Sequence, residues 1–518
     1  MLISSSANTD PKLDSASLSH NFKMPNPGDV FMLSAFGWAA ICFFMVTVGD
    51  RLLYQLTRLS ASKVTRDILV DNQSSIAAVM IIGIIGIGLS HLILVRYPKV
   101  LVGLLLFGLA FSASVWPPLH NLAFIARYLV IVYLGVYGGI FLLQNFWKIL
   151  ADPYYRLIMI YLSWIAIVVL AYELKIRDIW YLGTEFILML ALGIGWLSRI
   201  DNYDRLIEFN KLIAYLGIIF TFFHMLSPLV VEEAISGGRF QSYFIRATGF
   251  STTFSFFVVA LFWLSMFEER KLPKQLATVF ALLGLALILL SGTRNATAAT
   301  VIGVGALWWV FRTRIIVYLV ALVMMGLLVQ ILLSGNENIE FVASRLQSTE
   351  NTRLDAWALY AGLMMDSPFI GYGYKGLVDA VYGGTLVAFI TQYVNVNVPG
   401  IHNYYLGLAV RFGIPALLLA CCIFYMALIT SWRVIFSDFI PDREKQAYIL
   451  PCALLLLVVA EGMFEDAIGS TGKGSVHGVL FGSSAYFMVV YGRRLLDRFN
   501  GSDSSKKTHA ASEYLPEN

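Results

Sequence analysis

The sequence predicts an all-α, polytopic membrane helical bundle, and three observations support this fold class. Of the 518 residues, 58% are hydrophobic and only 14% are charged, whereas about a quarter of the residues in a soluble domain are charged. Nearly uncharged runs such as 76–95, 212–231 and 315–333 are about 20 residues long, enough for a helix to cross the bilayer core. Backbone groups in lipid must be paired within their own segment, so these runs are expected to be helices.

The apolar runs predict about 12–14 transmembrane helices, because each crossing needs about 20 residues. The runs near 99–115 and 296–311 are the shortest, and their status decides the number. The candidate spans lie near 31–49, 75–95, 99–115, 123–143, 154–172, 181–197, 212–231, 249–267, 275–291, 296–311, 315–333, 403–431, 447–465 and 474–491.

A long hydrophilic stretch interrupts this pattern and divides the chain. Arg and Lys are enriched in short loops on the cytoplasmic side of a membrane. This rule places the basic C-terminal tail on the cytoplasmic side, and most of the other loops alternate between more and less basic as the rule requires. The basic segment 50–74 falls on the outer side and conflicts with this rule. The predicted parts are a cytoplasmic disordered tail at 1–30, the N-terminal part of the transmembrane bundle at 31–334, a periplasmic catalytic loop with short helices at 335–402, C-terminal transmembrane helices at 403–492 and a cytoplasmic tail at 493–518.

Four of the basic residues on the outer side of this topology stand out, namely Arg246, Arg294, Arg353 and His402. Arginine is permanently charged, and its planar fork matches the oxygens of a phosphate in pairs. The arginines therefore suit a pyrophosphate held at the membrane surface by its lipid tail, and His402 can serve as a base near neutral pH. The competing interpretation is that each arginine anchors the protein to lipid headgroups and that the histidine is a polar helix cap.

The hydrophilic loop contains one predicted helix, which begins at Arg353 with Thr352 as its N-cap. Its apolar positions recur at helical spacing, and that face is expected to lie on the membrane or on the bundle. Pro368 ends the helix. The following Gly371-Tyr-Gly-Tyr-Lys-Gly376 predicts turns with positive φ, which are plain turns more often than phosphate-binding loops. The apolar positions are Leu354, Trp357, Ala358, Ala361 and Met365.

Charged residues inside the predicted spans are costly in lipid, so each needs an explanation. Arg411 is expected to pair with Glu461 or Glu465 within the bundle, and a proton or ion pathway is the alternative, with which Arg127 is also compatible. The sequence has no metal-site spacing such as His-Glu-x-x-His, so we expect neither a metal nor another cofactor. Fixed cations must then stabilise the leaving group of any transfer reaction.

Several of these residues lie in motifs that resemble one family. The stretches Arg353-Leu-Asp-Ala-Trp357, Ser367-Pro-Phe-Ile-Gly-Tyr-Gly373, and His402-Asn-Tyr-Tyr-Leu406 with Gly413-Ile-Pro resemble the O-antigen ligase and Wzy-type polysaccharide polymerase superfamily. Upstream, Arg246-Ala-Thr-Gly-Phe and Ser291-Gly-Thr-Arg294 are similar to the two preceding motifs of that superfamily. The resemblance covers roughly 240–430. It departs from the family pattern at Ala416, and at Ser251, which stands where an asparagine is usual.

The resemblance implies a metal-independent, inverting glycosyltransferase in the bacterial inner membrane, with its active site on the periplasmic side. Its donor would be a glycan on undecaprenyl pyrophosphate. Its acceptor would be lipid A–core oligosaccharide for a ligase of lipopolysaccharide biosynthesis, or a second lipid-linked glycan for a polymerase, and the sequence leaves this choice open. No nucleic-acid partner is expected.

The same resemblance implies roles for individual residues. His402, Arg353, Arg246 and Arg294 would be catalytic. The residues expected to bind substrate are Asn403, Lys375, Tyr372, Tyr374 and Trp357. Two other functions remain compatible with the residues: a polytopic transporter or flippase for a lipid-linked or anionic substrate, and a non-catalytic assembly partner.

Overall fold

The computed structural model describes ten segments of the chain, and every structural statement below concerns them alone. Arg353, Tyr374, Lys375 and Glu465 lie outside these segments, as do most of the predicted loop and the basic segment 50–74. The described segments are 25–48, 83–89, 91–92, 98–171, 202–236, 238–244, 246–312, 354–373, 401–464 and 484–499.

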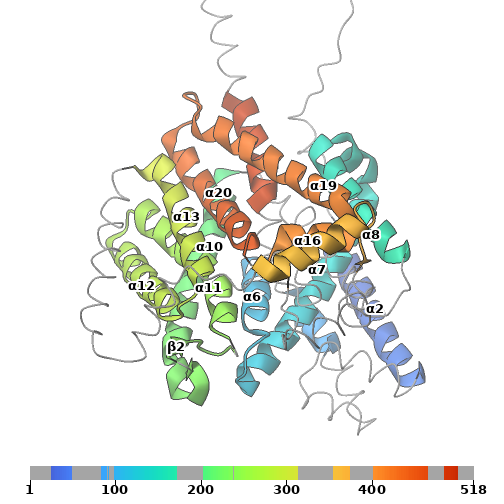
Figure 1. The fold of residues 1–518 in the computed structure, drawn as a ribbon, viewed down its shortest axis with the longest axis horizontal. Helices are drawn as coiled ribbons and strands as arrows, with labels where there is room; N and C mark the ends of the chain where they lie inside the picture. Colours follow the sequence, from blue (N-terminus) through green and yellow to red (C-terminus); the bar gives the residue numbers. More distant parts are fainter. Residues whose placement is uncertain are drawn as a thin grey trace, which may run out of the picture.

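The described chain is almost entirely helical, which confirms the predicted fold class (Figure 1). Its helices of more than ten residues are α2 (Pro27–Val48), α6 (Pro98–Phe111), α7 (Pro117–Ala151), α8 (Pro153–Ala171), α10 (Tyr203–Leu226), α11 (Ala247–Phe267), α12 (Lys271–Leu290), α13 (Arg294–Phe311), α16 (Leu354–Asp366), α19 (Tyr404–Ile435) and α20 (Asp442–Gly462). The connection from α10 to α11 contains two short 3-10 turns, Ser227–Leu229 and Glu232–Ala234, and a small hairpin of β1 (Ile235–Ser236) and β2 (Arg239–Phe240). A π-helical turn spans Phe487–Tyr491.

Six of these helices are long and apolar enough to cross a membrane: α8, α10 with its following turn, α11, α12, α19 and α20. The run near 99–115 forms only the 14-residue α6, which is shorter than the roughly 20 residues that a crossing needs. The protein is therefore a multi-pass membrane protein. The predicted number of 12–14 spans stays a prediction, since several candidate spans lie outside the described segments.

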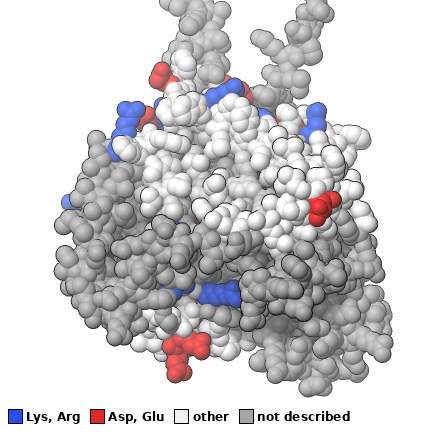
Figure 2. Space-filling model, in the orientation of Figure 1, with Lys and Arg blue, Asp and Glu red and all other residues white. Residues whose placement is uncertain are grey.

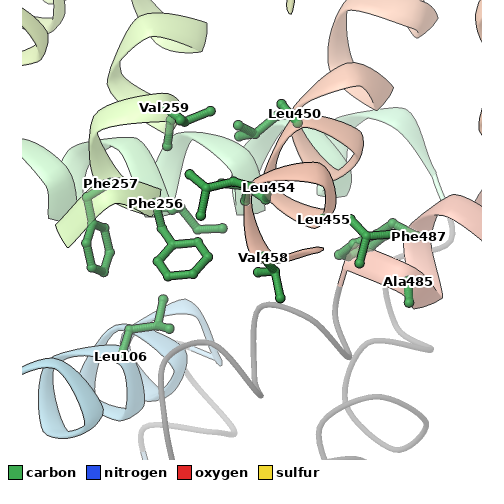
Figure 3. Close-up of a cluster of buried hydrophobic side chains, with 14 of the residues drawn as sticks. Leu106, Phe256, Phe257, Val259, Leu450, Leu454, Leu455, Val458, Ala485 and Phe487 are labelled. Carbon is green, nitrogen blue, oxygen red and sulfur yellow. The ribbon is translucent and has the colours of Figure 1, made fainter. Parts of the chain in front are cut away.

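Helix α11 lies at the centre of the bundle. Of its membrane-length window, 89% is buried, against 28% for α12, because α11 is apolar on every side and is covered by α10, α12, α13 and α20. Figure 3 shows Phe256 and Val259 of α11 beside Leu450 and Leu454 of α20. The bundle is therefore organised around α11 and its contact with α20.

A polar network ties several helix ends together at one end of the bundle. Lys211 pairs with Glu268, and Trp263 Nε1 donates to the carbonyl of Gln446 at 2.7 Å. Burial raises the pKa of Glu268, but the hydrogen bonds and charges of Lys211 and Arg270 outweigh it and leave this pKa below its ordinary value. These residues lie in or beside the helix ends that the sequence predicts on the cytoplasmic side. Figure 2 shows Lys and Arg atoms near the upper end and in one lower patch, and the described surface directly below the upper end is largely uncharged.

Helix α19 is broken at Gly413, whose φ of 79° and ψ of 168° are non-helical. Pro415, two residues later, has no N–H for the helix. The groups released by the break find partners elsewhere: Ile414 N donates to Pro368 O at 2.7 Å, and Trp164 Nε1 of α8 donates to Phe412 O at 2.8 Å. The break can therefore sit among apolar helices, because its backbone groups are paired within the protein.

We predict that Gly413→Ala destabilises the protein by roughly 1–3 kcal/mol or more, because this backbone region is essentially reserved for glycine. An added Cβ would also collide with the carbonyl oxygen of Phe369. Thermal unfolding of the purified protein in detergent measures the effect. The control is Gly305→Ala in α13, where a Cβ meets nothing within 4 Å. If both variants unfold at the wild-type temperature, the break does not depend on glycine.

Candidate functional site

The glycine-containing turn after α16 docks on the break in α19. Tyr372 N donates to Val410 O at 2.9 Å, in place of the helical bond that Val410 would otherwise accept. Gly371 has a φ of 69°, and a Cβ there would meet the backbone of Val410 and Arg411. The sequence predicted positive φ in this turn, which Gly371 and Gly373 confirm. The two family-like stretches 367–373 and 402–415 are thus one structural unit, and the amide of Tyr372 holds it together.

His402 stands between two hydrogen bonds that fix its backbone. Trp357 Nε1 of α16 donates to the carbonyl of Ile401 at 2.9 Å, directly before the histidine. Directly after it, Asn403 caps α19, with its side-chain oxygen accepting from Leu406 N at 3.0 Å. His402 itself has a φ of 44°, a left-handed conformation that costs a non-glycine residue roughly 1–2 kcal/mol. These bonds fix the backbone on both sides of His402, and its side chain is half-exposed directly before the start of α19.

Helix α16 packs on α19, mainly with a different face from the one that the sequence singled out (Figure 1). The face toward α19 contains Ala356, Tyr360 and Leu363, which form a small core with Ile401 and Val410. Leu354 and Met365 of the predicted face are 59% and 70% exposed. The alternative in which that face covers the bundle is therefore wrong for these two residues. Helical spacing identified apolar positions correctly but did not select the one stripe that meets α19.

The C-terminal end of α20 connects the histidine turn to α11. Tyr405, three residues after His402, donates from its hydroxyl to Val459 O at 3.1 Å. Two residues further along α20, the buried Glu461 accepts a hydrogen bond from Ser255 of α11 at 2.9 Å. The N-terminal part of α19 and the N-terminal half of α11 therefore lie at the same end of the bundle. The expected Arg411–Glu461 ion pair stays a prediction.

Arg246 and Arg294 are both exposed at helix starts on this same end. Arg246 is the N-cap of α11 and Arg294 is the first residue of α13. The helix between them, α12, runs antiparallel to α11 and returns the chain to this end before α13 begins. The predicted gathering of Arg246, Arg294 and His402 at one end is thus compatible with the fold. Arg353 lies outside the described segments.

One arginine at this end was not singled out by the sequence. Arg239 of β2 donates from Nε to Ser291 O at 2.7 Å and from a terminal nitrogen to Thr293 Oγ1 at 3.1 Å. It therefore forms two hydrogen bonds with the turn that precedes Arg294. No spacing or motif marks Arg239, because only the hairpin brings it against a turn 52 residues later in the chain.

A second histidine, His224, lies near the C-terminal end of α10. Its side chain is buried, with Nδ1 at 2.7 Å from Ser242 Oγ. Rings of Phe111, Phe250 and Phe254 surround it. The packing is that of a satisfied core histidine. The described residues contain no group of three or more His, Cys, Asp or Glu placed to hold a metal ion.

The comparison with protein families agrees with this part of the chain. Residues 279–421 match the family O-antigen ligase, a stretch that includes Arg294, α13, α16, the glycine turn, His402 and the break in α19. Arg246 and Arg239 precede the matched residues. No curated protein matches the chain. Residues 279–421 are thus similar to the O-antigen ligase family, and this match supports the resemblance of the motifs to the O-antigen ligase/Wzy superfamily.

Proposed function

We propose that this protein moves a glycan from undecaprenyl pyrophosphate to an acceptor hydroxyl at the periplasmic face, without a metal and with inversion. The family supports a membrane glycosyltransferase of the ligase or polymerase type. The observation that carries the finer proposal is the histidine turn. It is held rigidly by α16 and by the cap of α19, at the bundle end where two exposed arginines begin their helices.

The proposed reaction is a single displacement. The acceptor oxygen attacks the anomeric carbon, the bond from that carbon to the phosphate oxygen breaks, and the lipid pyrophosphate leaves with the bonding electrons. His402 takes the proton of the attacking hydroxyl. Negative charge grows on the leaving phosphate, so arginines already in place lower the barrier there. Arg246, Arg294 and Arg353 are proposed for this role, with Lys375, Tyr372 and Tyr374 at the substrate.

The contacts of Trp357 and Asn403 suggest how these two residues would serve the reaction. The indole N–H of Trp357 and the side-chain oxygen of Asn403 already have partners in the protein. We propose that their polar groups position His402, while the Trp357 ring and the Asn403 amide nitrogen remain available to substrate.

The first prediction concerns this histidine turn. His402→Ala should insert and fold normally but accumulate lipid-linked glycan, because it removes the base and leaves the bundle intact. Trp357→Phe keeps an aromatic side chain but loses the indole N–H, so it should lower kcat by roughly 10-fold while KM for the acceptor changes little. Single-turnover and steady-state rates of the purified protein measure both effects.

The control is the combined variant. If Trp357 acts through His402, Trp357→Phe should have no further effect in the His402→Ala background. Mature glycan at wild-type levels with His402→Ala would remove this residue from the mechanism. An increase in KM alone for Trp357→Phe would show that the indole binds substrate directly.

A second prediction concerns the arginines. Lysine keeps the charge but lacks the planar fork, so Arg246→Lys, Arg294→Lys and Arg353→Lys should each lower donor turnover, by up to about 10²–10³-fold for a group that stabilises the leaving phosphate. Arg270→Lys is the control, because Arg270 is exposed at the opposite end of α12. Four variants with equal, wild-type rates would mean that these arginines are membrane anchors.

The third prediction is the orientation in the membrane. A cysteine replacing the exposed Glu232, near the proposed site, should react with a membrane-impermeant thiol reagent in intact spheroplasts. One replacing the exposed Asp438, between α19 and α20, should react only after lysis. Both are made after the native cysteines have been changed to serine. The reverse pattern would put the proposed site on the cytoplasmic side.

A further inference from the structure

The turn between α12 and α13 is short, and its own hydrogen bonds include Gly292 N to Leu289 O at 2.9 Å and Thr293 N to Ser291 Oγ at 3.3 Å. Ser291 is the C-cap of α12, and Gly292 has a φ of 60°. Thr293 is the N-cap of α13, but its side chain makes no capping hydrogen bond. Arg294 then places a positive charge on the first residue of α13, where the helix dipole is itself positive and disfavours it. The dipole of α13 therefore does not favour the charge of Arg294 in this place.

Arg239, from the β1–β2 hairpin, forms two hydrogen bonds with this turn. Its Nε–H reaches the carbonyl of Ser291 at 2.7 Å, and a terminal N–H reaches Thr293 Oγ1 at 3.1 Å. The two acceptors lie on either side of Gly292, so one guanidinium spans the turn. Because the guanidinium is planar with fixed donor directions, binding two acceptors sets the orientation of the turn as well as its distance.

The hairpin that carries Arg239 is itself firmly held. Gln241 Nε2 donates to Glu233 O at 2.7 Å, which joins the residues directly after and before the hairpin. Tyr243 donates from its hydroxyl to Phe223 O of α10 at 2.9 Å, and burial raises its pKa, which keeps this donor protonated. Ser242 Oγ contacts His224, also of α10. The guanidinium of Arg239 is thus supported by α10, a helix outside the residues that match the ligase family.

We propose that Arg239 is a positioning residue that holds Arg294 in the geometry for binding the donor pyrophosphate. This inference rests on the proposed function, since it assigns Arg239 a role through Arg294. The bonds of Nε and one terminal nitrogen are within the protein, and the side chain is half-buried. Arg239 is therefore expected to act on the ligand indirectly.

The test measures binding of undecaprenyl pyrophosphate without a glycan to the full-length protein in nanodiscs. Arg294→Ala should weaken binding by about 10-fold or more, the effect of losing a charge-assisted hydrogen bond. Arg239→Lys cannot span the turn and should weaken binding several-fold, to about 10-fold at most. Because Arg239 acts through Arg294, adding Arg239→Lys to Arg294→Ala should change the Kd by less than about twofold.

Two further variants separate positioning from general support. Gln241→Ala removes a bond inside the hairpin without touching the turn, and should bind the lipid like wild type even if it melts at a lower temperature. Thr293→Val removes one of the two acceptors of Arg239 and should weaken binding in the same direction as Arg239→Lys. If Arg239→Lys does not fold, Thr293→Val in the wild-type and Arg294→Ala backgrounds provides the same comparison.

The outcomes distinguish this inference from the function on which it rests. Unchanged binding by Arg294→Ala would remove Arg294 from the donor site, and both proposals would fail at this residue. Weaker binding by Arg294→Ala, with a further multiplicative loss from Arg239→Lys, would overturn only the role of Arg239. A loss with Gln241→Ala equal to that with Arg239→Lys would also overturn it, because hairpin stability alone would then explain the effect.

Discussion

The break in α19 at Gly413 is the constraint on which the rest of the site depends. An interrupted helix in a membrane protein leaves backbone groups that water cannot reach, and each must find a partner inside the protein. Here the partners come from two directions: Trp164 of α8, and the turn 368–372 that follows α16. The loop segment after α16 is therefore part of the bundle. Its position in turn fixes α16, and α16 fixes the residue before His402 through Trp357.

The need to pair buried polar groups also explains how α11, α19 and α20 are linked at the site. Glu461 is fully buried, and a buried carboxylate is costly unless it is hydrogen-bonded. Its contact with Ser255 links α20 to α11 two to three turns below Arg246. Tyr405 makes a second link, to the backbone of α20. The histidine and the arginines come from helices far apart in sequence, and these few polar contacts within the apolar core set how those helices meet.

Much of the fold could be predicted because the membrane restricts the choices. Long apolar runs become helices, and the predicted spans near 249–267 and 403–431 correspond closely to α11 and α19. The shorter run near 99–115 was overestimated, because α6 ends at Phe111 and the small residues Ser112-Ala-Ser that follow begin a turn. The helix α16 was also predicted, together with its end before Pro368. Its buried stripe was not, because apolar residues surround much of this helix and only the shape of α19 selects Ala356, Tyr360 and Leu363.

By itself the sequence determined the class of the protein, the places where charge and glycine interrupt the apolar helices, and the motifs that resemble the ligase family. Those features follow from local chemistry: hydropathy, permanent charge and backbone freedom. Only the tertiary structure decided which of those residues form hydrogen bonds with one another. In the folded protein, the Trp357 indole donates a hydrogen bond to Ile401, the Tyr372 amide to Val410 and the Arg239 guanidinium to the turn before Arg294. Hydrogen bonds between segments 38 to 52 residues apart depend on how helices cross, and no periodicity within one segment records that geometry.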